Sequence, residues 1–382
     1  MFGRIQAWGR KQVTHGAEGA RHLEAGNYTE AERHLALAVA HAEEHRSAAA
    51  TQILLRLQLA EAQRKLGKFD QAKQTLHVAT VCTAREGNAA AYVECLDALA
   101  GVFEDAGNFS EVQKVLVEAG RLEAALPHPD AGNVARRTRR LGLARHKLGQ
   151  DASALLEEAV TLYGQAFGAE DLETGDSLTE LGAIYRGQGK HAEAQRCLRR
   201  AVKIHENGYG PDSDEALRDL QNLAESLDES GDPDAAAGQY ERLLEHMQRV
   251  VGCNMDEVAE MQCKIARSHI RWGNYSRVRE LLSEAIGTFS RTKGPRMADT
   301  LETLAHVEEL SGHVRSAISE LSKAAPIWES SGPQHKIDLA RNMIKRAELH
   351  MLLQETNDAK WLRERAAELS DESPGDPSVG SH

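Results

Sequence analysis

The chain has 382 residues, of which 41% are apolar, 4% aromatic and 27% charged. Counting glycine, roughly half of the residues are of types that fill folded cores, which excludes a disordered chain. The net charge of −12 disfavours a general nucleic-acid-binding surface, and the sequence contains no uncharged apolar run long enough to span a membrane.

The N-terminal segment is expected to be a short cap over residues 1–9. Residues 1–12 contain three basic side chains but no continuous apolar stretch, so they do not look like a secretory signal. Phe2, Ile5 and Trp8 leave open an amphipathic helix that docks on a membrane or a partner, although nearby glycines disfavour a helix.

The five cysteines are odd in number, scattered, and form no C-x-x-C pair. This distribution indicates buried, small apolar residues in a reducing compartment, and we expect a cytoplasmic location. The cysteines are Cys82, Cys95, Cys197, Cys253 and Cys263.

A short motif recurs along the chain, as in Gly26–Ala31 and Gly67–Ala72. The small residue that ends it, here called the anchor, returns every 39 to 42 residues. Although length alone suggests two or three domains, this period predicts one repeat domain of nine repeats over 10–370. Residues 371–382, rich in Ser, Pro, Gly and Asp, are expected to be disordered. The anchors are Ala31, Ala72, Val112, Ala152, Ala194, Ala236, Val278, Ala317 and Ala359, and the turns lie near residues 26, 67, 107, 149, 189, 231, 273, 312 and 355.

Each repeat is predicted to be a pair of helices. A large residue usually follows the anchor by four positions and a small one by seven, as in Leu35 and Ala38, which marks one stripe of a helix. Twelve residues before the anchor lies another small residue, such as Gly19 or Ala60, which allows the two helix axes to approach closely.

Repeat four departs from this register. Arg140 stands twelve residues before its anchor, where a small residue is expected. If the turn after Gly149 is two residues shorter than elsewhere, Gly142 takes the small position instead. We predict this contraction.

The start of the second helix is predicted from capping patterns. Thr29 with Glu32, and Ser110 with Gln113, fit the capping box, in which a hydroxyl and a carboxylate or amide satisfy the first backbone N–H groups.

The turn motif and the small-residue pattern resemble tetratricopeptide repeats, and the longer unit, with Tyr209–Asp212 before Leu220–Ala224, is similar to the repeats of kinesin light chains and their bacterial relatives. The resemblance implies an all-α, right-handed α-solenoid whose first helices line a concave groove. Kinesin light chains bind peptides that contain a tryptophan together with acidic residues. Relatives that clamp a carboxylate use lysine and asparagine on successive first helices; Gln221 and Asn222 are the one clear amide pair here.

A cluster of basic residues distinguishes the first helix of repeat four, whereas repeats three, six and eight carry acids there. Its apolar stripe leaves Arg136, Arg139, Arg140 and Lys147 on or near one exposed face. Three interpretations stay open: a solvated helix neutralised by acidic neighbours, a docking patch for a carboxylate-bearing peptide, and a nucleic-acid patch.

These patterns predict a non-catalytic scaffold or adaptor that binds an extended peptide or a helix of a partner protein. We expect no cofactor, no metal, no nucleic-acid partner and no membrane span. A peptide-sensing regulator is an alternative that would use the same groove. The predicted groove residues are Arg136, Arg139, Arg140, Lys147, Arg186, Arg218, Gln221, Asn222, Glu225 and Arg267.

One motif suggests an enzyme instead. His41 to His45 reads H-x-x-E-H, with two histidines on one helical face, as in inverted zinc proteases. A zinc-dependent hydrolase is therefore a further alternative, disfavoured because a solenoid supplies no obvious substrate cleft.

Overall fold

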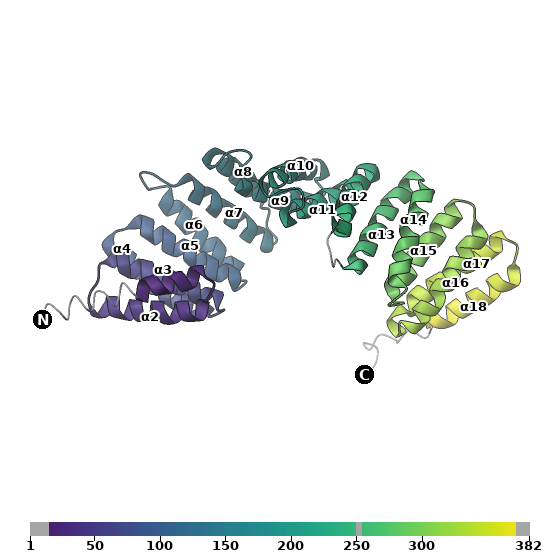
Figure 1. The fold of residues 1–382 in the computed structure, drawn as a ribbon, viewed down its shortest axis with the longest axis horizontal. Coiled ribbons are helices and arrows are strands. Elements are labelled where there is room, and N and C mark those ends of the chain that lie inside the picture. The colour runs from purple at the N-terminus through teal and green to yellow at the C-terminus, as the bar shows by residue number, and fades with distance from the viewer. Residues whose placement is uncertain (1–14, 250–253, 372–382) are drawn as a thin grey trace, which may run out of the picture. The chain divides into compact units, whose positions relative to one another are not determined.

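The computed structural model describes residues 15–249 and 254–371, which form helices joined by short turns (Figure 1). No β-strand occurs in these ranges, so the predicted all-α fold class is confirmed. Residues 15–24 are helical and precede the labelled helices. These are α2 (Tyr28–Glu44), α3 (Ala49–Lys65), α4 (Phe69–Glu86), α5 (Ala89–Asp105), α6 (Phe109–Glu123), α7 (Ala131–Lys147), α8 (Ser153–Ala166), α9 (Leu172–Gly187), α10 (His191–Gly208), α11 (Asp214–Glu229), α12 (Pro233–Arg249), α13 (Met255–Trp272), α14 (Tyr275–Phe289), α15 (Pro295–Leu310), α16 (Val314–Ser330), the 3-10 helix η1 (Pro333–His335), α17 (Lys336–Leu352) and α18 (Thr356–Asp371).

The chain divides into two compact units, one ending at Gln188 and the other beginning at Gly189. The division falls within the fifth predicted repeat, between α9 and α10. In each unit, helices that are consecutive in the sequence pack against each other. None of the described helices combines the length and the hydropathy that a bilayer span requires.

Left-handed backbone at the turns separates the two helices of a repeat. In the third repeat, the N–H of Gly107 donates to the carbonyl of Glu104 at 2.9 Å, and that of Asn108 to Phe103 at 2.8 Å. These bonds satisfy carbonyls at the end of α5, as is common where a glycine follows a helix. The turn glycines with positive φ are Gly26, Gly67, Gly107, Gly149, Gly189, Gly231, Gly273 and Gly312, and Gln354 takes the same conformation before α18.

The predicted capping boxes are wrong, because the second helices begin earlier than expected. Helix α6 starts at Phe109, and the Asn108 side chain accepts from the N–H of Glu111. Ser110 already lies inside the first turn. In repeat one, α2 starts at Tyr28, after Asn27. The left-handed glycine leads the chain into the next helix after one further residue, which leaves no room for a later cap.

The predicted packing stripe is confirmed by burial. The anchors, the large residues four positions later and the small residues seven positions later are all buried. The small residues of the first helices are buried as well, and a Cβ added to Gly19 would lie 2.6 Å from Cγ of Leu35. The two helices of the first hairpin therefore meet where the sequence places its smallest residue.

The predicted contraction of repeat four is confirmed. A Cβ on Gly142 would lie 3.0 Å from Cγ of Leu156, so Gly142 faces the same position of its repeat that Gly19 faces in repeat one. Helix α8 begins only at Ser153, after the anchor Ala152. The second helix has lost its first turn, and the small residue has moved two positions to keep the contact.

Substituting Gly19→Ala tests the close approach of these helices. The added methyl group must displace the fully buried Leu35, and we expect a loss of about 1–3 kcal/mol in the free energy of unfolding. Gly120→Ala in α6 is the matched control, because no atom lies within 4 Å of its added Cβ. It should leave stability unchanged or raise it by up to about 1 kcal/mol. Denaturant titration of the full chain measures both, and equal shifts would contradict the packing described.

Candidate functional site

The first helix of each repeat carries the surface on which the candidate sites lie. Helix α3 contacts α5 in the first unit, and α13 contacts α15 in the second. In a stack of hairpins, helices that reach their second neighbours lie on the inner side. We call this surface in each unit its first-helix face. In the first unit it is the exposed side of residues 15–24, α3, α5, α7 and α9, and in the second unit it is the exposed side of α11, α13, α15 and α17.

Ion pairs connect first helices of adjacent repeats along this face. Each pairs a basic residue with an acid about one repeat away, so the charges neutralise one another across the helix stack. Pairs of this kind that remain exposed contribute little to stability. They include Arg64–Asp105, Arg137–Asp97, Arg139–Glu180, Arg140–Glu104, Lys264–Glu225, Arg271–Asp228, Arg296–Glu260 and Lys345–Glu309.

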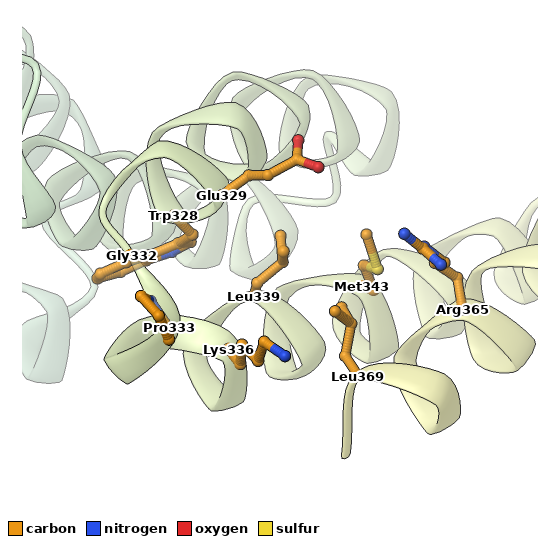
Figure 2. Close-up of a pocket in the computed structure, with 9 residues that line it drawn as sticks. All are labelled: Trp328, Glu329, Gly332, Pro333, Lys336, Leu339, Met343, Arg365 and Leu369. Carbon is orange, nitrogen blue, oxygen red and sulfur yellow. The ribbon is translucent and has the colours of Figure 1, made fainter. Parts of the chain in front are cut away.

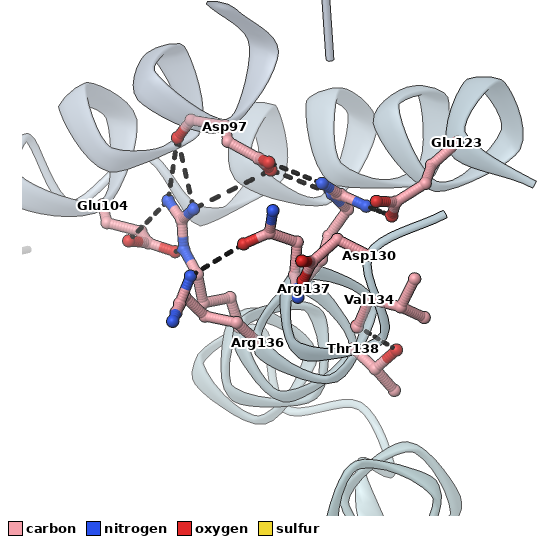
Figure 3. A network of polar contacts seen from close by, with 10 residues as sticks. Asp97, Glu104, Glu123, Asp130, Val134, Arg136, Arg137 and Thr138 are labelled. Atoms are coloured by element: carbon pink, nitrogen blue, oxygen red, sulfur yellow. Dashed lines mark hydrogen bonds and ion pairs between the residues drawn. The ribbon is translucent and has the colours of Figure 1, made fainter. Parts of the chain in front are cut away.

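Arg137 is the buried centre of the basic cluster. Its side chain is 5% exposed and pairs with Asp97 of α5 and Glu123 of α6, as Figure 3 shows. The Nε atom donates to Oδ1 of Asp97 at 2.9 Å. Burial would lower the pKa of Arg137, but the hydrogen bonds and charges of the two carboxylates outweigh it and raise the pKa above its usual value. Arg137 therefore joins repeats three and four and is not available to bind a ligand.

Two of the predicted groove arginines are also held by acids. Arg140 donates to both carboxylate oxygens of Glu104, at 2.9 and 3.0 Å, and to the backbone carbonyl of Asp97. Arg139 makes a similar two-point contact with Glu180 of α9, at 2.8 Å for each bond. Both arginine side chains are about one-fifth exposed. This arrangement matches the interpretation of a helix neutralised by its acidic neighbours.

We call the four predicted basic residues of α7, Arg136, Arg139, Arg140 and Lys147, the basic patch. The two that remain face solvent. Arg136 and Lys147 are exposed, and Arg136 donates to Oδ1 of Asn133 in its own helix at 2.9 Å. Arg186 of α9, another predicted groove residue, is half-buried.

A cleft in the second unit brings two further predicted residues together. Arg218 and Gln221 of α11 line a space of about 430 Å³ that also touches α12 and α13. Leu217, Leu243 and Met261 supply apolar walls, and charged groups stand among them. The other lining residues are Asp214, His246, Met247, Glu257, Glu260 and Lys264.

The other predicted residues of the second unit lie close to this cleft or one helix away. Asn222 and Glu225 are half-buried on α11. Glu225 accepts a hydrogen bond from Gln221 at 3.0 Å and pairs with Lys264 at 3.6 Å. Arg267 is exposed on α13.

A smaller space between α15 and α17 was missed by the sequence analysis. It measures about 180 Å³ and is lined by Glu302 and Asn342 among others. Oε1 of Glu302 accepts from Trp328 Nε1 and from Asn342 Nδ2, both at 2.8 Å, and burial raises the pKa of this carboxyl. Asn342 lies one repeat after Glu302, a spacing that could have identified the pair.

A third hollow lies beside η1 and α18 (Figure 2). Its volume is about 330 Å³, and Leu339 and Met343 of α17 line it together with Leu369 of α18. Trp328 and Pro333 border its other end. Its walls come from the second helices α16 and α18 as well as from α17.

His41 and His45, the pair behind the enzyme alternative, lie on α2 with ring centroids 4.5 Å apart. Two groups of described residues bring three possible metal ligands within 4.8 Å of one another, and neither contains this pair. These groups are His15, Glu18 and His34, and His350, Glu355 and Asp358.

The cysteine prediction is partly wrong. Cys95 and Cys263 are buried, and burial raises the pKa of Cys95 to about 12, so its thiol stays protonated. Cys82 and Cys197, however, are half-buried, because they lie beside the packing stripe rather than on it. Cys253, the apolar residues at positions 2, 5 and 8, and residues 372–382 lie outside the described residues.

Arg137 and its neighbour Arg136 provide a matched pair of variants. Arg137→Ala leaves the carboxylate of Glu123 buried without its cation, and we expect a loss of about 3–5 kcal/mol. Arg136→Ala removes an exposed side chain and should cost less than about 0.5 kcal/mol. Chemical denaturation checks both values. Similar small losses for the two variants would show that Arg137 is not a structural residue.

Comparison with known proteins identifies the repeats. Residues 134–207 and 178–249 match one model of the tetratricopeptide repeat, and residues 55–79 match another. A kinesin light chain-related protein of Arabidopsis thaliana is 23% identical over 296 residues, which cover 74% of this chain and 48% of the relative. The chain thus spans about half the length of that curated relative.

Solved structures show the same fold. The apo form of RapI superposes with a TM-score of 0.54 at 14% identity, covering 84% of this chain and 99% of that one. The C-terminal part of a repeat protein from Cytophaga hutchinsonii gives 0.52 at 10% identity, covering 71% and 95%. Residues 55–79 and 134–249 therefore contain tetratricopeptide repeats, and the chain is similar in sequence to a kinesin light chain-related protein.

Proposed function

We propose that the chain is a non-catalytic scaffold or adaptor whose first-helix face binds a segment of a partner protein. The observation that carries this proposal is the cleft of about 430 Å³ touching α11, α12 and α13. It combines apolar walls with charged and amide groups on two successive first helices. Repeat arrays commonly bind extended peptides or helices on such surfaces.

The lining of the cleft defines the segment that it suits. Leu217, Leu243 and Met261 form an apolar surface that would accept a large apolar side chain. Arg218 and Gln221 stand beside it and would hydrogen-bond a carboxylate or a backbone carbonyl of the same segment. The segment that fits is therefore an apolar anchor residue with one polar or acidic neighbour at Arg218. Further acids would be repelled by Asp214, Glu257 and Glu260, which also line the cleft.

An apolar stripe on α17 supports the use of the same face elsewhere in the second unit. Ile337, Ile344 and Met351 are 63%, 45% and 43% exposed, and they recur every seven residues, which places them on one side of the helix. Exposed apolar side chains that gather on one face are typical of protein interaction sites.

In the first unit, Arg136 and Lys147 are the residues of the basic patch that we propose for contact with an acidic partner. Arg139 and Arg140 are engaged by Glu180 and Glu104, so reversing their charge would disturb the helix stack as well as any binding. Variants at Arg136 and Lys147 separate binding from folding.

Charge reversal at two exposed arginines of the second unit tests the proposal. Arg218→Glu alters the cleft, whereas Arg199→Glu makes the same change on α10, a second helix. Partners captured from the native host by the unaltered chain should be recovered with Arg199→Glu and depleted at least about tenfold with Arg218→Glu, because the reversal places an acid where we propose that a carboxylate binds. Quantitative mass spectrometry of the captured proteins measures the ratio.

Circular dichroism of both variants provides the folding control. Equal recovery with Arg218→Glu and with the unaltered chain would contradict the cleft as the binding site. Depletion by Arg199→Glu alone would place binding on the second helices and overturn the proposal.

A further inference from the structure

Three potential metal ligands converge at the start of the described chain. His15 and Glu18 lie three residues apart on one face of the first helix, and His34 reaches them from α2. Nδ1 of His34 lies 2.9 Å from Oε2 of Glu18 and 3.1 Å from Nδ1 of His15. The third separation, from Nδ1 of His15 to Oε2 of Glu18, is 3.8 Å.

These three distances suit a small divalent cation. A triangle with these sides has a point about 2 Å from every corner, which is the length of a zinc bond to imidazole nitrogen or carboxylate oxygen. Two imidazoles and one carboxylate are a ligand set that zinc accepts. The side chain of His34 is 11% exposed, whereas those of His15 and Glu18 are 34% and 41% exposed, so one side of the site is open to water.

The packing of the first hairpin fixes this geometry. Glu18 and His34 are the immediate neighbours of Gly19 and Leu35, the pair whose close contact sets the distance between the two helices. A larger residue at position 19 would move His15 and Glu18 away from His34. The spacing of the two helices that carry the ligands is therefore fixed by a rigid contact.

We propose that His15, Glu18 and His34 form a Zn²⁺-binding site that joins the first helix to α2, with water completing the coordination. The site is distinct from the pair His41 and His45. It would stabilise the first hairpin, because a metal that binds across two packed helices favours the folded state by mass action.

Arg33 contacts the same histidine, and this contact disfavours metal binding. Its Nη2 atom lies 2.9 Å from Nε2 of His34 and 2.7 Å from Oε2 of Glu30. A guanidinium can only donate, so Nε2 accepts and the ring proton lies on Nδ1, between Glu18 and His15. Zinc must displace this proton from Nδ1, which leaves the neutral ring with its proton on Nε2. Arg33 must then turn away and keep Glu30 as its partner.

Titration of the full-length chain with Zn²⁺ alone, after chelator treatment and dialysis, tests the site. We expect one equivalent to bind and to raise the thermal midpoint. His15→Gln and Glu18→Gln each alter a partly exposed ligand and should weaken binding by at least about tenfold, since even residues that merely orient metal ligands change affinity by that factor. Arg33→Ala should bind at least as tightly as the unaltered chain.

Two control variants assign the zinc to this site. His41→Gln with His45→Gln, and His350→Gln, should leave both the affinity and the shift of the thermal midpoint unchanged. Absence of stoichiometric zinc in the unaltered chain would overturn the proposal. Unchanged binding in His15→Gln and Glu18→Gln, or loss of binding in either control, would overturn it as well.

Discussion

The contact between a small residue on one helix and a large one on the next determines the rest of the structure. Gly19 against Leu35 and Gly142 against Leu156 show it most clearly, because in both pairs an added Cβ would approach the leucine to 3.0 Å or less. Repeat four keeps this contact even though its second helix has lost a turn. In repeat four, therefore, the turn is shorter and the packing contact is retained.

The sequence predicted the features that depend on this contact. The register, the positions of the turn glycines and the contraction at Gly142 all follow from where small residues recur. The helix starts did not follow, because asparagine is favoured before a helix as much as threonine or serine. The helices begin after Asn27 and Asn108, and not after Thr29 and Ser110. Where an asparagine and a serine or threonine stand two residues apart, the sequence does not indicate which of them precedes the helix.

The candidate site was predicted less well, since exposure was inferred from one helix at a time. Arg139 and Arg140 face outward on α7, but Glu180 and Glu104 of the adjacent first helices reach them. Each acid lies about one repeat away from its arginine, so the period itself contained the missing information. Arg218 and Gln221 lie beside a cleft because their neighbours on α12 and α13 include apolar side chains as well as charged ones.

Pairing of charges along the first helices leaves three surfaces suited to a partner: the cleft at α11 and the apolar stripe of α17 in the second unit, and the exposed Arg136 and Lys147 of α7 in the first. The most direct measurement places a photo-crosslinking residue at Ile344 on α17 or at Trp361 on α18, two exposed apolar positions of the same hairpin, 45% and 61% accessible. A partner protein should become crosslinked from position 344 and not from 361. Crosslinking from 361 without crosslinking from 344 would contradict the assignment of binding to the first helices.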